Sequence, residues 1–228
     1  MNTPEKKTLG AGLLLLAAFV LWTVLIQSVD VQPLGQNGTD IGFAALNCWF
    51  HRLCGVHMMI YTATDWLGLV PIAVCLCFGG IGFAQLLKRK SLFRVDADII
   101  LLGVYYVLVI AGYLIFESIP INYRPIPING VMEASYPSST TLLVLSVMPT
   151  LNLQARRRIE NQALKRTICV ASAVFTLFMV LGRTVAGVHW LTDILGAVLL
   201  SAGLFLLYKA CVMMIDRRRL WTEGTDWN

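Results

Sequence analysis

The chain has 228 residues, of which 57% are hydrophobic and only 14% charged, and its formal net charge is +5. Soluble domains carry about 25% charged residues, so this shortfall and a mean hydropathy of +0.70 exclude an ordinary soluble globule and predict a membrane protein. In such a protein an excess of Lys and Arg reflects the topology of the chain, and no nucleic-acid partner is expected.

The first apolar run, Leu9–Val29, is predicted to be a retained membrane span. It follows Lys6 and Lys7, as in a signal peptide, but it is longer than the apolar part of one and no small-x-small cleavage site comes after it. The next segment is mixed in polarity, and its middle part, Ile41–Tyr61, alternates apolar and polar side chains. This alternation predicts an amphipathic helix at the membrane interface rather than a span.

Five further apolar runs predict the remaining spans, which gives an all-α, polytopic membrane protein with about six transmembrane helices. The runs are Trp66–Leu87, Ile99–Phe116, the short Ser138–Leu151, Thr167–Leu181 and Leu191–Ile215. A polar loop rich in proline, Glu117–Pro137, separates the third and fourth spans.

The basic residues predict the orientation of these spans. With the N- and C-termini cytoplasmic, 15 of the 18 Lys and Arg residues lie on the cytoplasmic side, in agreement with the positive-inside rule. Only Arg52, Arg124 and Arg183 lie on the other side. A charge near the membrane that departs from this rule is a candidate functional residue.

Arg183, His189 and Asp193 form the strongest candidate site. His189 and Asp193 are four residues apart and share one face if the sixth helix begins near Val188. The carboxylate can then accept the Nδ1 proton of the imidazole and leave Nε2 as a nucleophile towards phosphorus. The planar guanidinium of Arg183 suits a phosphate group. The structural alternative is an ion pair between Arg183 and Asp193, with His189 at the interface.

Two earlier segments are predicted to reach the same membrane face. Tyr136–Thr141 combines a proline with hydroxyl residues, which is typical of a helix N-terminus, and the N–H groups there bind anions. Arg124, followed by Pro125, lies in the loop just before. Alone, these segments are explained by ordinary capping and by a solvated arginine. Together with His189 they predict a binding and reaction site for a phosphate group.

At these residues the chain resembles the type 2 phosphatidic acid phosphatases, a family of integral-membrane lipid phosphatases. The family signature has three parts, KxxxxxxRP, PSGH and SRxxxxxHxxxD. The third part is intact at Arg183, His189 and Asp193, with Gly182 in place of the usual Ser. The resemblance covers Glu117 to Asp193, about a third of the chain, and the six-span layout extends it further.

The first two parts of the signature are altered. Arg124 and Pro125 are kept, but Glu117 stands in place of the lysine. The second part keeps Pro137 and Ser138 and then has hydroxyl residues in place of Gly and His. These two residues are Ser139 and Thr140.

The resemblance implies a two-step hydrolysis through a phosphohistidine, in which His189 attacks phosphorus and Asp193 orients it. The phosphoryl oxygens would be held by Arg124, Arg183, Ser138 and Ser139. The expected enzyme is a phosphoric monoester or diphosphate hydrolase that needs no metal and no cofactor. It would be a single integral-membrane domain over residues 1–228 in the cell membrane, with an extra-cytoplasmic segment at 30–65. Its site-bearing segments would be 117–141 and 182–193, on the extra-cytoplasmic face.

The altered positions leave several functions open. The second-motif histidine of the family protonates the leaving group, which the hydroxyl of Thr140 cannot do near neutral pH. One alternative is a substrate whose leaving group needs no proton, such as a lipid diphosphate, which expels a stable phosphate anion. Another is that Glu117 or Glu133 supplies the proton, with a pKa raised by an apolar site. Alternatively, the chain is a non-catalytic family member that binds the headgroup of a phospholipid or polyprenyl phosphate. A transporter is disfavoured, because the predicted spans carry no charge deep within them.

Overall fold

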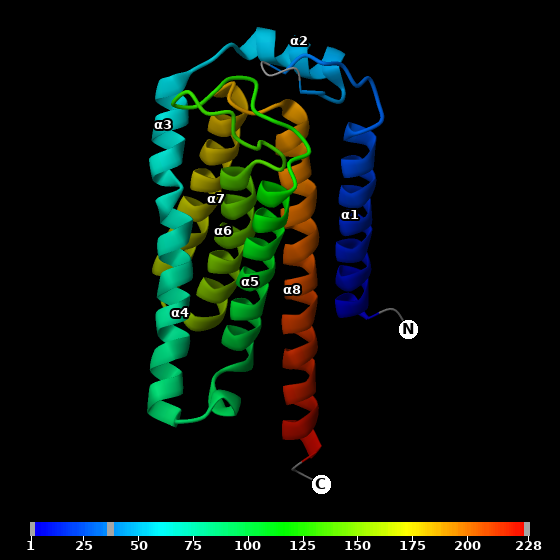
Figure 1. The fold of residues 1–228 in the computed structure, drawn as a ribbon. Helices are drawn as coiled ribbons and strands as arrows, with labels where there is room; N and C mark the ends of the chain where they lie inside the picture. Colours follow the sequence, from blue (N-terminus) through cyan, green and yellow to red (C-terminus); the bar gives the residue numbers. More distant parts are fainter. Residues whose placement is uncertain (1–2, 36–38, 226–228) are drawn as a thin grey trace.

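The computed structural model describes residues 3–35 and 39–225, with side chains through residue 218, and this part of the chain is almost entirely α-helical (Figure 1). The helices in chain order are α1 (Pro4–Ile26), α2 (Ala44–Cys54), α3 (Met58–Leu67), α4 (Leu69–Arg89), the 3-10 helix η1 (Leu92–Arg94), α5 (Ala97–Ser118), α6 (Ser139–Arg158), α7 (Gln162–Val185) and α8 (Leu191–Thr225). The described loops form isolated β-bridges and no strand. The all-α fold class predicted from hydropathy is therefore confirmed.

Five helical segments of the described chain are long and apolar enough to cross a membrane. They are Pro4–Ile26, Met58–Arg89, Ala97–Ser118, Gln162–Val185 and Leu191–Arg218. Their outer faces expose large apolar side chains, for example Leu14, Leu76, Val107 and Val174. Hydrocarbon tolerates such a surface, because the backbone polar groups are satisfied within each helix. The chain is a multi-pass membrane protein.

Helix α6 runs alongside these segments but is more polar, because it packs among α4, α5, α7 and α8. Its polar groups meet partners from neighbouring helices: Tyr105 Oη donates to the carbonyl oxygen of Ser146 at 2.9 Å, and Gln154 Nε2 donates to Tyr208 Oη at 3.0 Å. A helix without a lipid-facing surface needs no continuous apolar stripe. The predicted short span Ser138–Leu151 is thus the first part of a longer, central helix.

The predicted interfacial helix Ile41–Tyr61 differs from the observed one. Helix α2 ends at Cys54, because Gly55 has a φ of +69°, a conformation that glycine adopts readily and that breaks a helix. From Met58 the chain continues as α3 and α4, so the second span begins earlier than the predicted Trp66. Helix α2 itself lies across one end of the bundle, as an interfacial helix should (Figure 1). Residues 36–38 of the preceding segment lie outside the described residues.

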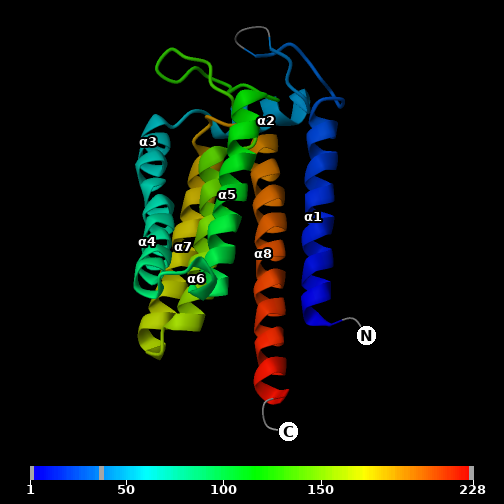
Figure 2. The same cartoon turned by 60° about the horizontal axis from the view of Figure 1, so that its bottom comes forward.

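Helix α1 lies along α8 at the edge of the bundle (Figures 1 and 2). Glycines allow this close approach: a Cβ on Gly12 would lie 3.1 Å from the carbonyl oxygen of Gly203, and a Cβ on Gly203 would lie 2.7 Å from a methyl carbon of Leu16. Small residues at such positions are how membrane helices bring their backbones together. The first apolar run is therefore an integral part of the bundle.

The loops and termini distinguish the two ends of the bundle. We call the end formed by α2 and by the connectors 119–138 and 186–190 the site end. Helix α1 begins and α8 ends at the opposite end, where the short η1 also lies (Figure 1). Of the three arginines that depart from the predicted charge rule, Arg124 lies in the connector 119–138 and Arg183 in the last turn of α7, next to the connector 186–190. Arg52 lies on the exposed side of α2, where its Nε donates to the carbonyl oxygen of Cys48 in the same helix.

Candidate active site

The connector between α7 and α8 carries His189. Helix α8 begins at Leu191, so His189 precedes the helix and does not share a helical face with Asp193, as a start near Val188 would require. The turn of the connector nevertheless brings His189 Nδ1 to 3.8 Å from Asp193 Oδ2. Asp193 itself caps the start of α8, because its Oδ2 accepts from the backbone N–H of Trp190 at 2.9 Å.

His189 is held as a neutral imidazole. Its Nδ1 lies 3.2 Å from the carbonyl oxygen of Ser135, and since a carbonyl can only accept, Nδ1 donates and Nε2 carries the lone pair. Burial lowers the pKa of His189, and the nearby Asp193 carboxylate opposes this shift only in part. The neutral form therefore dominates near neutral pH. This is the protonation state that a nucleophilic histidine requires.

Asp193 is fully buried and has a second partner besides Trp190. Its Oδ1 accepts from Asn122 Nδ2 at 3.1 Å, and its backbone carbonyl accepts from the N–H of Ser138 at 3.2 Å. Asp193 thus joins three segments: the start of α8, the connector after α5 and the start of α6. At 3.8 Å from His189 Nδ1, the carboxylate of Asp193 supports the imidazole electrostatically. The hydrogen bond that Nδ1 donates goes to the carbonyl oxygen of Ser135.

Two arginines lie against the ring of Tyr61, on α3. The guanidinium carbon of Arg183 is 4.8 Å from the ring centroid and that of Arg124 is 5.8 Å. Each arginine also has one carboxylate: Arg183 Nη2 lies 3.4 Å from Asp65, and Arg124 Nη2 lies 3.0 Å from Glu133. Both carboxylates are at least 40% exposed, whereas both arginines are more than 90% buried. Burying two guanidinium groups side by side is unfavourable unless a further anion joins them.

Four buried nitrogen atoms of this site have no hydrogen-bond partner within the described residues. They are Arg124 Nε, Arg124 Nη1, Arg183 Nε and His189 Nε2, and we call them the open nitrogens. Buried polar groups in folded proteins are nearly always satisfied, so a cluster of exceptions indicates a ligand. Three of the four are N–H donors of cations and the fourth is a lone pair. This combination suits a phosphate group attacked by the histidine.

The start of α6 lies beside these residues. Ser138 is the N-cap, and its Oγ donates to Thr141 Oγ1 at 3.0 Å. The backbone N–H of Ser138 is used by Asp193, so the N–H groups available to an anion are those of the first turn, beginning with Ser139. Ser138 thus links α6 to α8 through its N–H, and the predicted phosphate-binding roles of Ser138 and Ser139 stay predictions.

A cavity of about 160 Å³ adjoins the site, and its wall is mainly polar. Its polar lining comes from Glu117, Arg124, Glu133, Ser135 and Ser139. Glu117 therefore lies in the cavity at the position predicted from the signature, with Glu133 nearby. Thr140 lines a different cavity, which contains mostly apolar residues of α4 and α5. The structure thus separates Thr140 from the carboxylates of the polar cavity.

Four residues of the site were not predicted from the sequence. Tyr61 and Asp65 come from α3. Tyr61 was the last residue of the predicted interfacial helix and Asp65 lay between that helix and the next predicted span, and no local pattern connects either with Arg183. Asn122 and Ser135 lie in the proline-rich loop, where polar residues are common. The sequence signal that could have indicated Asn122 and Ser135 is that each lies within three residues of a signature residue, Arg124 or Pro137.

The fold and the site together define a class: a multi-pass helical membrane protein with a buried, basic site at one end of the bundle. The sequence profile of the PAP2 superfamily matches residues 96–217, more than half of the chain. The chain belongs to the PAP2 superfamily, which confirms the resemblance described above. At the level of the family this supports a lipid phosphatase.

One solved structure is similar over nearly the whole chain. It is the PAP2-type phosphatidylglycerolphosphate phosphatase of Bacillus subtilis, with a TM-score of 0.57 and 18% sequence identity, covering 90% of this chain and 96% of that protein. At this identity the similarity establishes the fold alone. No curated protein sequence matches the chain significantly.

Proposed function

We propose that this protein hydrolyses a phosphate ester or anhydride of a membrane lipid through a phosphohistidine on His189. The open nitrogens carry the proposal: a buried imidazole lone pair lies in the same site as two buried guanidinium groups with N–H donors to spare. Such donors bind the phosphoryl oxygens and stabilise the charge of the transition state. The carbonyl of Ser135 and the carboxylate of Asp193, both beside His189 Nδ1, support the same function because they favour the tautomer with the proton on Nδ1 and the lone pair on Nε2.

The reaction has two steps. In the first, the Nε2 lone pair of His189 forms a bond to phosphorus while the bond from phosphorus to the leaving oxygen breaks. With a lipid diphosphate, the leaving group is the lipid monophosphate anion, which needs no proton. With a monoester, the leaving group is an alcohol, and its oxygen must take up a proton as the bond breaks. In the second step, a water molecule attacks phosphorus, the P–N bond breaks and inorganic phosphate is released. Arg124, Arg183 and the first N–H groups of α6 hold the phosphoryl oxygens in both steps.

The lack of an obvious proton donor for the leaving group favours a lipid diphosphate as the substrate. Thr140 is no acid, and the carboxylate of Glu133 is already paired with Arg124 at 3.0 Å. A site without a ready proton donor loses more activity towards a monoester, whose alkoxide is a poor leaving group, than towards a diphosphate. A polyprenyl diphosphate is therefore the preferred substrate, with phosphatidic acid and phosphatidylglycerol phosphate as the monoester candidates.

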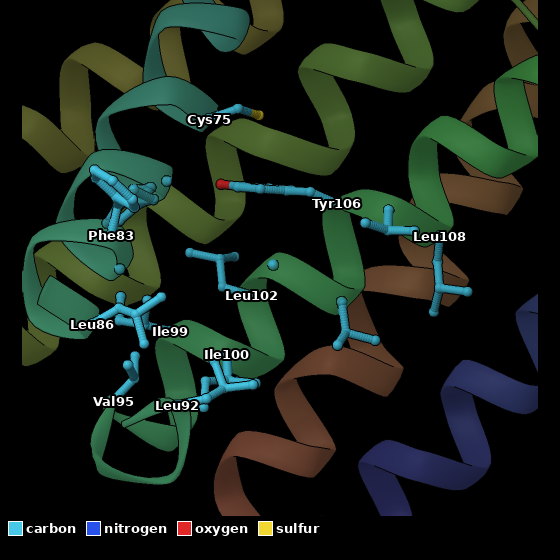
Figure 3. Close-up of a pocket in the computed structure, with 16 residues that line it drawn as sticks. Cys75, Phe83, Leu86, Leu92, Val95, Ile99, Ile100, Leu102, Tyr106 and Leu108 are labelled. Carbon is cyan, nitrogen blue, oxygen red and sulfur yellow. The ribbon is translucent and has the colours of Figure 1, made fainter. Parts of the chain in front are cut away.

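The cavities around the site support a lipid. Tyr113 and Ser139 line both the polar cavity and the apolar cavity of about 280 Å³ that contains Thr140, so the two cavities adjoin. A further cavity of about 590 Å³ lies between α4 and α5 towards the opposite end (Figure 3). Its lining includes Cys75 and Phe83 from α4 and Tyr106 from α5 (Figure 3). A phosphate headgroup in the polar cavity with its hydrocarbon chain beside α4 and α5 fits this arrangement.

The charge distribution supports an extra-cytoplasmic site in the cell membrane. The basic residues of the chain gather at the opposite end of the bundle, which the positive-inside rule assigns to the cytoplasm. Both termini would then be cytoplasmic and the site end would face outwards. We further propose that residues 1–228 act as a single domain, because α1 and α8, from the two ends of the chain, pack together.

The test is phosphate release by the purified protein in detergent, with a chelator present and without added metal. Polyprenyl diphosphate and phosphatidic acid are compared as substrates. We expect release from the diphosphate, and a loss on the order of 10⁴-fold or more in His189→Ala, because the nucleophile is removed. His57→Ala is the matched control, since it removes an exposed imidazole that bonds to the nearby carbonyl of Cys54 and leaves the backbone N–H of residue 57 in place.

A phosphorylated protein should also be trapped with the labelled diphosphate, and its label should be stable in alkali and lost in acid, as expected for a P–N bond. Full activity of His189→Ala would contradict the proposal.

The second candidate is a non-catalytic binder of lipid phosphate. The two carboxylates in the polar cavity, Glu117 and Glu133, and the replacement of the family histidine by Thr140 favour it. It predicts no release from either lipid, together with saturable binding of the same lipids that is lost in Arg183→Met and kept in His189→Ala. Lipid binding is measured with fluorescently labelled analogues.

A further inference from the structure

Helix α2 is bonded to the residues that surround His189. Asn47 is fully buried; its Nδ2 donates to Thr192 Oγ1 at 3.0 Å, and its Oδ1 accepts from the N–H of Thr192 at 3.3 Å. One turn later, His51 Nε2 donates to the carbonyl oxygen of Gly187 at 3.1 Å, and the ring of His51 packs on Trp190 with centroids 5.6 Å apart. These contacts bracket His189 on both sides along the chain.

The segment after α2 adds a backbone contact. The N–H of His57 donates to the carbonyl oxygen of Ala186 at 3.0 Å. Gly187 has a φ of +71°, and a Cβ there would lie 1.9 Å from the carbonyl oxygen of Gly55. The two backbones therefore touch at a point where only glycine fits. We call Asn47, His51 and Gly55–His57 the α2 clasp.

The opposite side of the same connector is held by the loop before α6. Trp190 Nε1 donates to the carbonyl oxygen of Tyr123 at 2.8 Å, and His189 Nδ1 donates to Ser135. The five-residue connector 186–190 is thus fixed from two directions. The loop side bonds the ring of His189 itself, whereas the hydrogen bonds of the α2 clasp go to Ala186, Gly187 and Thr192.

We propose that Asn47 and His51 are positioning residues that keep His189 in line with the bound phosphate, an inference that rests on the proposed function. A nucleophile displaced by about 1 Å loses on the order of 10²-fold in rate, so a connector without regular structure needs such external support. The α2 clasp precedes residues 96–217, the part that matches the superfamily profile. It is therefore a support for the nucleophile that lies outside the matched family core.

A pair of substitutions at His51 tests the positioning role. His51→Phe keeps an aromatic ring on Trp190 but removes the donor to Gly187, whereas His51→Gln restores a side-chain N–H. We expect His51→Phe to lower kcat for phosphate release from polyprenyl diphosphate about 10-fold, with KM within about twofold, and His51→Gln to recover most of the loss. Asn47→Ala should lower kcat about 100-fold. Arg52→Ala, on the exposed side of α2, should leave kcat unchanged.

Hydrogen–deuterium exchange of residues 186–192 gives a second readout that does not depend on catalysis. Exchange should be faster in His51→Phe and Asn47→Ala and unchanged in Arg52→Ala. Unchanged exchange in His51→Phe and Asn47→Ala overturns the inference, and so does faster exchange with an unchanged kcat. If wild-type protein releases no phosphate, or if His189→Ala retains activity, the proposed function fails. In that case the exchange result alone still decides whether the α2 clasp holds the connector.

Discussion

The two ends of the bundle differ in how completely their buried charged side chains are paired. At the opposite end, Asp98 is 4% exposed, and its Oδ2 lies 2.8 Å from Arg158 and 3.4 Å from Arg157. Arg157 also meets Asp216 through two bonds of 2.6 and 2.9 Å, and Arg158 reaches Asp96 at 3.1 Å. These side chains contribute no buried, unpaired nitrogen among the described residues.

At the site end the arginines are more deeply buried and less completely paired. Arg124 and Arg183 each have one carboxylate partner, at the exposed rim, and keep three of the open nitrogens between them. A network in which cations and carboxylates match joins helices and stabilises the fold. An excess of buried donors is unfavourable for stability and is retained where a ligand completes it. Under the proposed function, the comparison assigns a structural network to one end and phosphate binding to the other.

The comparison is tested most strongly by two equivalent substitutions, Arg183→Met and Arg157→Met. Methionine keeps much of the apolar volume and removes the charge. We expect Arg183→Met to lower kcat/KM for the lipid diphosphate about 10³-fold, because it removes a guanidinium group proposed to bind the phosphoryl oxygens. Its melting temperature should stay the same or rise, since replacing a poorly compensated buried charge by an apolar side chain is neutral or favourable.

Arg157→Met should give the reverse result. It leaves the buried carboxylate of Asp98 with one cation instead of two, so the free energy of unfolding should fall by about 1–3 kcal/mol while activity persists. Both variants are compared by thermal unfolding in detergent and by phosphate release. Equal losses of stability in the two variants would remove the distinction between the two ends.

Glu133 sharpens the comparison, because it is the carboxylate that pairs with Arg124 at the exposed rim of the site. Glu133→Gln removes a negative charge that competes with the phosphate group. Exposed ion pairs contribute up to about 1 kcal/mol, so KM for the lipid diphosphate should fall about two- to fivefold with kcat unchanged. Glu117→Gln is the matched variant in the same cavity. A large loss of kcat confined to phosphatidic acid would instead make Glu133 the proton donor for monoesters.

Much of this fold could be predicted because a bilayer imposes a simple rule on composition. Apolar runs of sufficient length located α1, α4, α5 and α7 to within one or two turns and gave the start of α8, whose polar last turns lie beyond the apolar run. The same rule found only the first part of α6, because the later polar side chains Thr150 and Gln154 bond to Tyr106 and Tyr208 of neighbouring helices. It also failed at Met58, where the break that ends α2 depends on the backbone conformation of one glycine.

The site was predictable where a motif is local in sequence and less so where it depends on packing. Arg183, His189 and Asp193 lie within eleven residues, and their spacing indicates the chemistry directly. The partner of His189 Nδ1 is a backbone carbonyl, that of Ser135, and a carbonyl leaves no signal in the sequence. Tyr61 is also invisible to spacing arguments, because it lies more than a hundred residues before Arg183.

The smallest expected effect concerns the pH dependence of the opposite end. Hydrogen bonds from Arg89, and then from Arg158 and Gln85, hold the pKa of Asp96 at about 2, against an ordinary value of about 3.9. A carboxyl group with a lowered pKa in the folded state stabilises the protein above its unfolded pKa, and this stabilisation is lost as the pH falls from about 4 to about 2.

Because Asp96 is partly exposed, its contribution is at most about 1 kcal/mol, or a few degrees in melting temperature. Melting curves between pH 5 and pH 2.5 should therefore show a drop that Asp96→Asn reduces and that Glu160→Gln, in the exposed α6–α7 connector, does not. A drop of equal size in Asp96→Asn would show that the bonds of Asp96, at the rim of the network, do not carry the pH dependence. The structural role of that end would then depend on its interior and not on its rim.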